Sequence, residues 1–427
     1  MIRKNLIDFG IGLAAVALLI FVKGQVEDSR TGRWFNVRGY EILHSFLTTY
    51  NPDEELPVIV LDISDLRRDP DGTTPTESLR KIIEALAESG AKAIAIDIDF
   101  SPRIELNPLR VGLRSETDEQ FFEFLHEQKR RGLPVFVGAY NIGTEPKTWL
   151  GTDKNKDLAA DMTLFDKGSD STEVRASLQC GENAKLYNIS KALAEIYGIH
   201  PRPPRWLRAT LVDYEDRENL RQIFLLDKSN REVVCQRAYT LVNYGKLELI
   251  QKLTLQTLDR DSIVGARDVN GKSRFQGKLV FIGNGQRDKT TDSFVVIGRS
   301  DPVFGVYIHA VAAYTLVADP VHRFKHSFSI LLDALLGMLI VTGLFMVRWL
   351  GGTRLSPHLW ESLFILIAIL VVLLLGFLMV RVYNILWLDF TLVILSILLH
   401  SKVQNGLSYP LRKLFNAHIV IRKGQHP

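Results

Sequence analysis

Three long apolar segments near the C-terminal end constrain the fold of this chain more than any other feature. They cover residues 328–347, 362–380 and 382–399, and only Asp333 and Asp389 interrupt them. Each approaches the ~20 residues with which an α-helix crosses about 30 Å of hydrocarbon. Buried helices of a soluble protein are the alternative, but three such segments joined by short linkers favour a bundle of membrane helices.

A further apolar segment, residues 6–22, lies near the N-terminus behind Arg3 and Lys4. Such a segment is either a signal peptide or an uncleaved membrane anchor. The small residues of a cleavage site belong at the end of the apolar stretch, and here they lie in its middle. We therefore interpret residues 6–22 as an anchor helix.

The distribution of basic residues predicts the orientation. If the N-terminus is cytoplasmic, nine Lys and Arg flank the spans inside and only Arg381 lies in the short external turn. Short cytoplasmic segments carry the excess of positive charge, whereas long domains are exempt from the count. We expect a protein of the cell membrane, in a bacterium the inner membrane, with both termini cytoplasmic. Its parts are an N-terminus and anchor, an external domain, a three-helix bundle and a tail, covering residues 1–22, 23–326, 327–400 and 401–427.

The external segment reads as an α/β domain. Residues 57–63 and 91–100 are apolar runs that end in aspartates, the pattern of parallel strands buried on both faces. Between them, residues 74–77 (TPTE) form a capping box with proline at the first helical position, and Gly90 ends the helix. The result is a βαβ unit.

The same alternation continues along the domain. A second capping box at residues 115–118 opens a helix that ends at Gly132, and residues 133–140 form a third strand. A polar segment follows, and then come a helix around residues 186–198, strands at 239–245 and 278–284, and helices at 247–258 and 304–318. Alternating strands and helices predict the α/β class with a mainly parallel sheet.

Order and layout together resemble a known family. The features are the first βαβ unit with Asp62, the segment 275–318, and one span followed by a domain and three spans. They are similar to the extracellular sensory domains associated with cyclases and histidine kinases, second type (the CHASE family). The resemblance implies an external sensor that signals through three membrane helices to a cytoplasmic output domain. Only 27 residues follow the last span here, too few for such an enzyme domain.

Candidate ligand-binding residues lie at the strand ends. Asp62 and Asp65 follow the first strand, and Asp97 and Asp99 end the second. Ligands of open α/β sheets bind at the carboxyl ends of the strands, where such carboxylates suit a hard cation or hydrogen bonds to a ligand. The alternative is that these aspartates cap turns.

The loop after residues 278–284 is the second candidate, since Asn284 and Arg287 lie in it beside glycines. Arg287 would suit an anion, but the loop lacks nucleotide-binding spacing, and a plain loop is the alternative. His309 reads as a hydrogen-bonded core residue, because no His, Cys or Glu nearby has metal-ligand spacing. We expect no metal and no cofactor.

Two cysteines in 427 residues, Cys180 and Cys235, are too few for a disulfide scaffold. On the oxidising side of a bacterial membrane a disulfide between them is allowed, and two unpaired buried cysteines are the equal alternative. The net charge of +4 is too small to indicate nucleic acid as a partner.

Polar residues of the bundle form a candidate relay. Asp333 and Asp389 enter their spans to matched depth from outside, and Arg381 lies at the outer end of the third span. Carboxylates are costly in lipid and should face the bundle interior. Contact with headgroup water is the alternative.

The tail has no acidic residue, and its basic residues attract anionic lipid. A more specific hypothesis is that the tail docks a cytoplasmic partner through the same five side chains, Lys402, Arg412, Lys413, Arg422 and Lys423.

We therefore expect a non-enzymatic membrane sensor that relays a signal to a separately encoded cytoplasmic effector, with membrane lipid as a further partner. Sensors of this kind usually signal as oligomers, although no heptad run demonstrates one. A structural or assembly subunit of a membrane complex is the alternative. An external hydrolase that uses the strand-end aspartates is a third hypothesis, which no nucleophile motif supports.

Overall fold

A computed structural model of the chain describes part of its 427 residues, and the statements below concern that part. The described residues are 10, 14, 17, 21, 38–42, 55–67, 74–98, 100, 116–139, 155, 157–165, 173–180, 186–198, 210–211, 221–226, 232–252, 259–268, 270–285, 292–350 and 357–386. They fall into two compact units, one built from residues 47–208 and 212–322 and the other from the remainder, including everything from residue 323 on.

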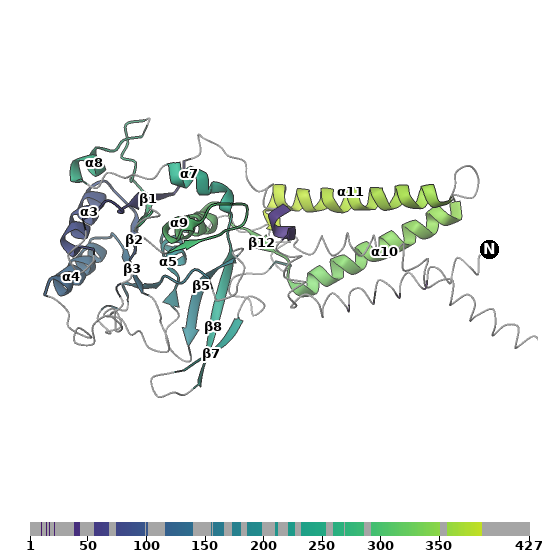
Figure 1. The fold of residues 1–427 in the computed structure, drawn as a ribbon, viewed down its shortest axis with the longest axis horizontal. Helices are drawn as coiled ribbons and strands as arrows, with labels where there is room; N and C mark the ends of the chain where they lie inside the picture. Colours follow the sequence, from purple (N-terminus) through teal and green to yellow (C-terminus); the bar gives the residue numbers. More distant parts are fainter. Residues whose placement is uncertain are drawn as a thin grey trace, which may run out of the picture. The chain divides into compact units, whose positions relative to one another are not determined.

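The larger unit is built on a parallel five-stranded sheet with the strand order β1-β9-β2-β3-β4 (Figure 1). Every neighbouring pair in it is parallel. Its strands are β1 (Val58–Asp62), β2 (Ala93–Asp97), β3 (Val135–Ala139), β4 (Ala159–Asp161) and β9 (Leu279–Gly283). The α/β class and the parallel sheet are confirmed.

Strand β9 lies between β1 and β2, so the first βαβ unit is split by a strand from far along the chain. All five residues of β9 are buried. Continuous burial is what an apolar run in a parallel sheet indicates, because helices cover both faces.

Helices form a layer on each face of this sheet (Figure 1). Ile59 and Leu61 of β1 contribute to the core shared with α3 (Thr76–Glu88), α4 (Glu116–Arg130) and α8 (Arg260–Gly265). Val58 and Val60 contribute to the opposite core, with α5 (Ile189–Tyr197), α7 (Leu247–Lys252) and α9 (Gly305–Val317). Successive strand residues alternate between the faces, which divides the domain into two cores.

The helix boundaries bear on the predicted caps. Helix α3 begins at Thr76 with Pro75 at the cap position and no side-chain capping bond, so the predicted capping role of Thr74 is wrong. Gly90 ends this helix in a left-handed conformation (φ 81°), as expected. Helix α5 begins later than predicted, because residues Leu186–Tyr187 form strand β6 and Asn188 caps the helix.

A second, antiparallel sheet is the main departure from the sequence-based prediction. Its strand order is β6-β5-β8-β7, and it was not expected. The predicted strand 239–245 is the end of the longer β8, and its last residues are in the short helix η3. Of the other strands, β5 lies in the segment interpreted as polar, β6 lies in residues predicted to be helical, and β7 lies where no element was predicted. The bounds are β5 (Glu173–Cys180), β7 (Arg221–Leu226), β8 (Glu232–Leu241) and η3 (Tyr244–Lys246).

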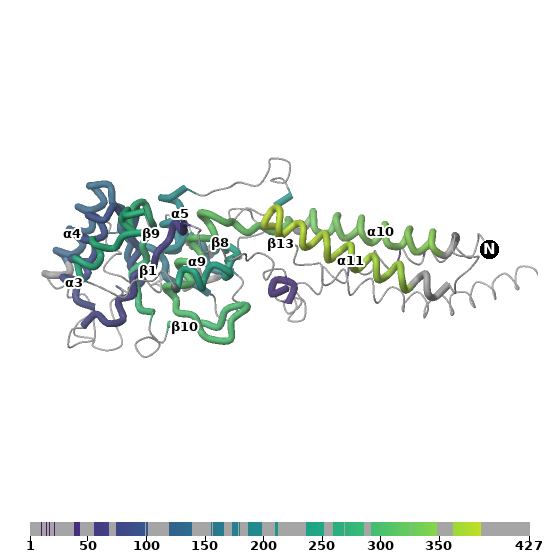
Figure 2. The backbone as a smooth tube through the Cα atoms, turned by 90° about the horizontal axis from the view of Figure 1, so that it is seen from above, coloured from purple at the N-terminus to yellow at the C-terminus, as the bar shows by residue number. Residues whose placement is uncertain are grey.

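The smaller unit contains two long helices, α10 (His326–Leu350) and α11 (Pro357–Tyr383), which run side by side in antiparallel directions (Figure 2). They pack closely at Gly343, where an added methyl group would overlap the ring of Phe364. Within the described residues, two segments are long and apolar enough to cross a membrane, Ser327–Val347 and Ser362–Tyr383.

The other predicted spans are described only in part. Val382 belongs to α11, and Ile385–Leu386 form the short strand β13, so the fourth span does not begin at residue 382 as predicted. The rest of that span and most of residues 6–22 lie outside the described residues. The remaining short strands are β10 (Ser293–Phe294), β11 (Val303–Phe304) and β12 (His322–Arg323).

Candidate functional site: the carboxyl edge of the parallel sheet

Asp62 joins two loops at the carboxyl edge of the sheet. It is the last residue of β1, and its Oδ1 accepts hydrogen bonds from the backbone N–H groups of Ser64 and Gly285, both at 2.9 Å. The Ser64 hydroxyl contacts both Asp62 and the side chain of Asn284. Because a hydroxyl has one proton, Ser64 donates to one of these two side-chain oxygens at a time, and it accepts from the Gly285 N–H at 3.0 Å. The predicted neighbours Asp62 and Asn284 therefore do lie together.

The same loops approach each other too closely for a side chain at Gly285. A Cβ atom at this position would lie 2.9 Å from Asp62 Oδ2 and 2.8 Å from the Tyr307 hydroxyl. Glycine is thus required where the loop after β9 passes over the end of β1. Because Tyr307 belongs to α9, the contact also brings that helix to the sheet edge.

Asp97 ends β2 beside this junction, and its surroundings differ. Its side chain is only 4% exposed, and no described group lies within hydrogen-bond reach of its Oδ1. Burial raises the pKa of the Asp97 carboxyl well above its ordinary value, and the nearby Asp292 charge raises it further. A buried carboxyl in such a place keeps its proton at pH values where an exposed one has lost it.

Asp292 brings a second carboxyl to the start of α9. Its backbone C=O accepts a hydrogen bond from Gly305 N–H at 3.1 Å, and a methyl group on Gly305 would overlap its carboxylate. Partial burial raises the pKa of the Asp292 carboxyl. Sequence reasoning noted this loop but did not single out Asp292.

His309 lies one turn further along α9 and is 1% exposed. Its Nε2 lies 3.2 Å from the Met162 carbonyl oxygen, so Nε2 carries the proton, and Nδ1 accepts from the Ser190 hydroxyl at 2.9 Å. Burial lowers the pKa of this imidazole to about 3. The prediction of a hydrogen-bonded core histidine fits these contacts.

The contact between His309 and Asp97 links the helix to the strand end. Nε2 lies 3.8 Å from Asp97 Oδ1. Since the two pKa shifts favour an uncharged imidazole and an uncharged carboxyl, this is an approach of two neutral polar groups rather than an ion pair.

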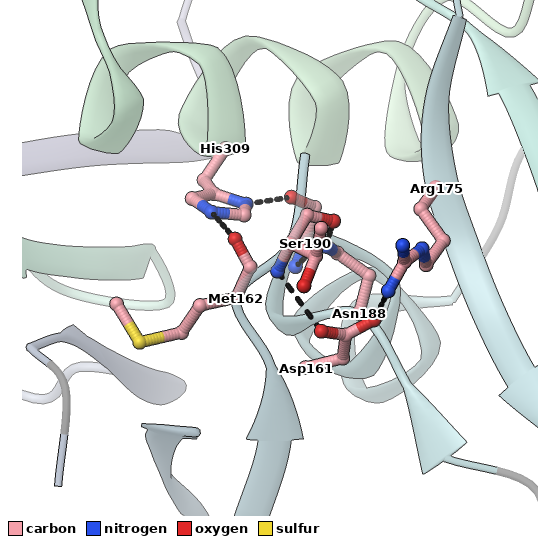
Figure 3. A network of polar contacts seen from close by, with 7 residues as sticks. Asp161, Met162, Arg175, Asn188, Ser190 and His309 are labelled. Atoms are coloured by element: carbon pink, nitrogen blue, oxygen red, sulfur yellow. Dashed lines mark hydrogen bonds and ion pairs between the residues drawn. The ribbon is translucent and has the colours of Figure 1, made fainter. Parts of the chain in front are cut away.

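A buried polar network continues from His309 into the second sheet (Figure 3). Arg175 on β5 pairs with Asp161 on β4 at 3.0 Å, and both side chains are almost fully buried. Asn188 donates to the Thr163 carbonyl at 3.0 Å and accepts from Ser190 N–H at the start of α5. The network thus connects α9 and α5 with β4, an edge strand of the parallel sheet, and β5, an inner strand of the antiparallel sheet. Sequence reasoning missed it because these residues lie in or beside a segment read as a polar loop.

The carboxyl edge of the sheet gathers several groups that can form hydrogen bonds. It offers two carboxyl groups with raised pKa values, a hydroxyl, an amide and loop N–H groups, which suit hydrogen bonding to a small polar or charged ligand. Among the described residues there is no group of three His, Cys, Asp or Glu side chains that could hold a metal ion. The Ser190 hydroxyl does pair with the His309 imidazole, and both residues are only 1% exposed.

A comparison with protein families places this architecture. A model described as the CHASE2 domain matches residues 11–347, which is more than half of the chain. The chain belongs to the CHASE2 domain family. The resemblance in sequence order is therefore confirmed, and the chain carries a sensory extracellular domain of this family. No curated protein and no solved structure matches it.

The CHASE2 match runs past the α/β domain and through most of α10. The first of the two apolar C-terminal helices thus lies within the range that the family model matches, as the sheet-edge residues do. Both helices fit a membrane protein.

The other predicted site residues of this CHASE2 protein are scattered. Asp65 is exposed, and Asp99 and Arg287 lie outside the described residues. Asp333 is 8% exposed within α10, Arg381 is exposed near the end of α11, and Asp389 lies outside the described part. The basic tail residues Lys402, Arg412, Lys413, Arg422 and Lys423 are likewise not described. The relay cluster and the docking role of the tail stay predictions.

Proposed function

We propose that this chain is a multi-pass membrane sensor without enzymatic activity. A ligand or protein binds at the carboxyl edge of its external CHASE2 domain. Helix α9 passes the change to α10, and the membrane bundle relays it to a separately encoded cytoplasmic effector. The membership in a family of sensory domains supports the first step, and the connection between α9 and the site supports the second.

The position of α9 carries the proposal. Its first turn contacts the sheet edge through Gly305 and Tyr307, and its second turn brings His309 to Asp97. The same helix ends at Val317, and only residues 318–325 separate it from α10. A ligand that displaces the Asp62 or Asp97 loops therefore acts on the element that leads into the first C-terminal membrane helix. A rigid helix is a suitable carrier for such a displacement.

The proposed topology has both termini in the cytoplasm and the CHASE2 domain outside. The asymmetry of basic residues supports it, and the apolar surfaces of α10 and α11 support insertion. In this arrangement the basic tail meets the anionic inner leaflet and any effector that docks there. Asp333, buried in α10, would contribute to helix packing in the bundle.

A chimera tests the relay without knowledge of the ligand. A nucleotide cyclase catalytic domain fused after residue 400 would report the state of the bundle as cyclic nucleotide in cells. Replacing Asp97 by Asn removes the ionisable group at the edge, and we expect the output to change about fivefold, a typical coupling between sites.

The matched control is Glu77→Gln on α3, which likewise replaces one carboxyl group by an amide. Glu77 is exposed, and within the described part of the chain it forms an ion pair with Lys81 in the next turn. It should leave the output unchanged. Equal outputs from the wild type and both variants, with all three inserted and folded, would contradict the relay and favour a structural subunit.

The separate effector has its own test. A pull-down through residues 401–427 from a membrane extract should recover a cytoplasmic signalling enzyme or regulator. Neutralising the five basic residues should abolish recovery. Recovery of lipid alone would show that the tail is a membrane contact and that no effector docks there.

A further inference from the structure

Strands β5 and β8 bring the two cysteines of the chain together. The antiparallel pairing of these strands sets Cys180 directly opposite Cys235. The two preceding register positions, Gln179 with Gln236 and Leu178 with Arg237, are regular, and the bulge in β5 lies further back, between Arg175 and Ser177. The residues 181–234 intervene in the sequence, so chain proximity does not account for the match.

Backbone geometry at such a position permits a disulfide. Directly opposite residues of an antiparallel pair lie on the same face of the sheet, with Cα atoms about 4.5 or 5.5 Å apart. Disulfides span Cα distances of about 4.4–6.8 Å. A bond between two cysteines at one register position therefore requires no movement of the strands.

We propose that Cys180 and Cys235 form an intramolecular disulfide that fastens β5 to β8. The proposal rests on the external location of the domain in the proposed function, because disulfides persist in oxidising compartments. It decides between the two alternatives that the sequence left open, a bonded pair and two unpaired thiols.

The oxidation needs an acceptor for two electrons. The thiolate of one cysteine attacks the disulfide of an extracytoplasmic thiol oxidase and forms a mixed disulfide. The second thiolate then displaces the oxidase, which leaves as a dithiol. Two thiol protons and two electrons have left the CHASE2 domain, one S–S bond has formed in it, and one S–S bond of the oxidase has been reduced.

The enclosed segment gives the bond a structural consequence. Residues 181–234 include β6, α5 and β7. Helix α5 carries Ser190, whose hydroxyl binds His309. Closing this long loop removes conformations from the unfolded chain and stabilises the sheet from which α5 departs. The disulfide thus stabilises the strands next to the buried polar network.

Thiol counting tests the pairing. The full chain is extracted from membranes, quenched in acid and treated with a maleimide polymer that shifts the gel band once per free thiol. We expect no shift without reductant and two shifts after reduction. The Cys180→Ser and Cys235→Ser variants should each shift once without reductant. Two shifts of the wild type without reductant, or a covalent dimer on a non-reducing gel, would overturn the proposal.

A location probe separates failure of the disulfide from failure of the topology. Val295 is 67% exposed and can be replaced by cysteine in a chain that lacks both native cysteines. If a membrane-impermeant maleimide labels it in intact cells while the native cysteines are free thiols, the disulfide is wrong and the topology stands. If labelling requires permeabilised cells, the location is wrong and the disulfide falls with it.

A stability measurement uses a neighbouring pair as control. The double variant C180S/C235S should melt roughly 5–10 °C below the wild type, and reductant should lower the wild type equally. The control Gln179→Ser/Gln236→Ser changes the adjacent register position, whose side chains are exposed, and should melt within about 1 °C of the wild type. Insensitivity of the wild type to reductant would contradict the proposal even if the double variant failed to fold.

Discussion

Helices α9 and α10 follow each other in the chain and are both rich in apolar residues, yet they bury them in different ways. All 13 residues of α9 are buried within the α/β domain. Helix α10 is longer and leaves large apolar side chains exposed, among them Leu331, Leu335, Met338 and Leu339. The apolar side chains of α9 pack inside the protein core, whereas the exposed apolar side chains of α10 suit contact with membrane lipid. Apolar content alone does not distinguish the two cases, but helix length and side-chain exposure do.

The largest effect is expected from a charge in the middle of α9. Ile308 is fully buried, and Ile308→Asp would place a carboxyl among apolar side chains. We expect a loss of more than about 4 kcal/mol, enough to unfold the domain, because burial of an unpaired charge is added to the loss of apolar contact. Thermal unfolding and limited proteolysis of the detergent-purified chain would detect it. A variant that melts like the wild type would mean that α9 is not a core helix.

The same carboxyl in α10 should act on insertion instead. Leu339 is 67% exposed near the middle of the helix, and Leu339→Asp should cost about 3 kcal/mol of membrane insertion. The melting temperature of the external domain should not change. A membrane-integration assay provides the measurement, with Leu339→Val as the control. Unfolding of the domain without an insertion defect would reverse the assignment of α10.

The polar residue of α9 should make the domain acid-sensitive. Folding lowers the pKa of His309 from 6.5 to about 3, so the unfolded chain takes up a proton that the folded one does not. The stability that His309 contributes is complete above about pH 6.5 and falls as the pH drops toward 3, by about 3 kcal/mol at pH 4. Melting temperatures across this range should show that His309→Gln loses less stability on acidification than the wild type. An identical acid profile would contradict the buried neutral imidazole.

Asp97 should show an effect of opposite sign. Folding raises its pKa above 3.8, so the folded chain holds the extra proton. Its contribution is complete below about pH 3.8 and is lost as the pH rises through the folded pKa. Asp97→Asn should therefore melt higher relative to the wild type as the pH increases. The gain in melting temperature is partial, because folding also raises the pKa of Asp292. That carboxyl remains in the variant and still lowers stability as the pH rises.

The two pH variants control each other. In the wild type, His309 makes stability rise with pH and Asp97 makes it fall, between their unfolded pKa values. In each single variant, the pH dependence of stability reports the residue that remains. If both variants shifted the profile in the same direction, the neutral pair at the sheet edge would be the wrong description.

The sequence predicted those parts of the fold that have a local sequence pattern. Strands β1, β2 and β9 are continuous apolar runs, and α9 matches its predicted range to within one residue at each end. The antiparallel sheet was missed because β5 does not alternate regularly. A bulge interrupts it at Arg175, and that buried arginine is satisfied by Asp161, a partner from another strand. A charged residue that reads as exposed in sequence is buried here because of a long-range pair.

The candidate site was predicted in part for the same reason. Strand ends identified Asp62, Asp97 and Asn284, since their position follows from the topology of parallel strands. The approach of Asp292 to Gly305 and of His309 to Asp97 depends on how α9 packs across the sheet. No local pattern encodes that packing.

The insertion of β9 between β1 and β2 has a consequence for biosynthesis. The ribosome makes β1 and β2 early, but the strand that separates them begins at residue 279. At roughly 5–20 residues per second, synthesis of residues 98–278 takes on the order of 10 to 40 s. During that interval two apolar strands have no partner between them, and pairing with each other directly would be a trap. We therefore expect the nascent domain to depend on chaperones as it emerges, and a chain truncated before residue 279 to aggregate instead of folding.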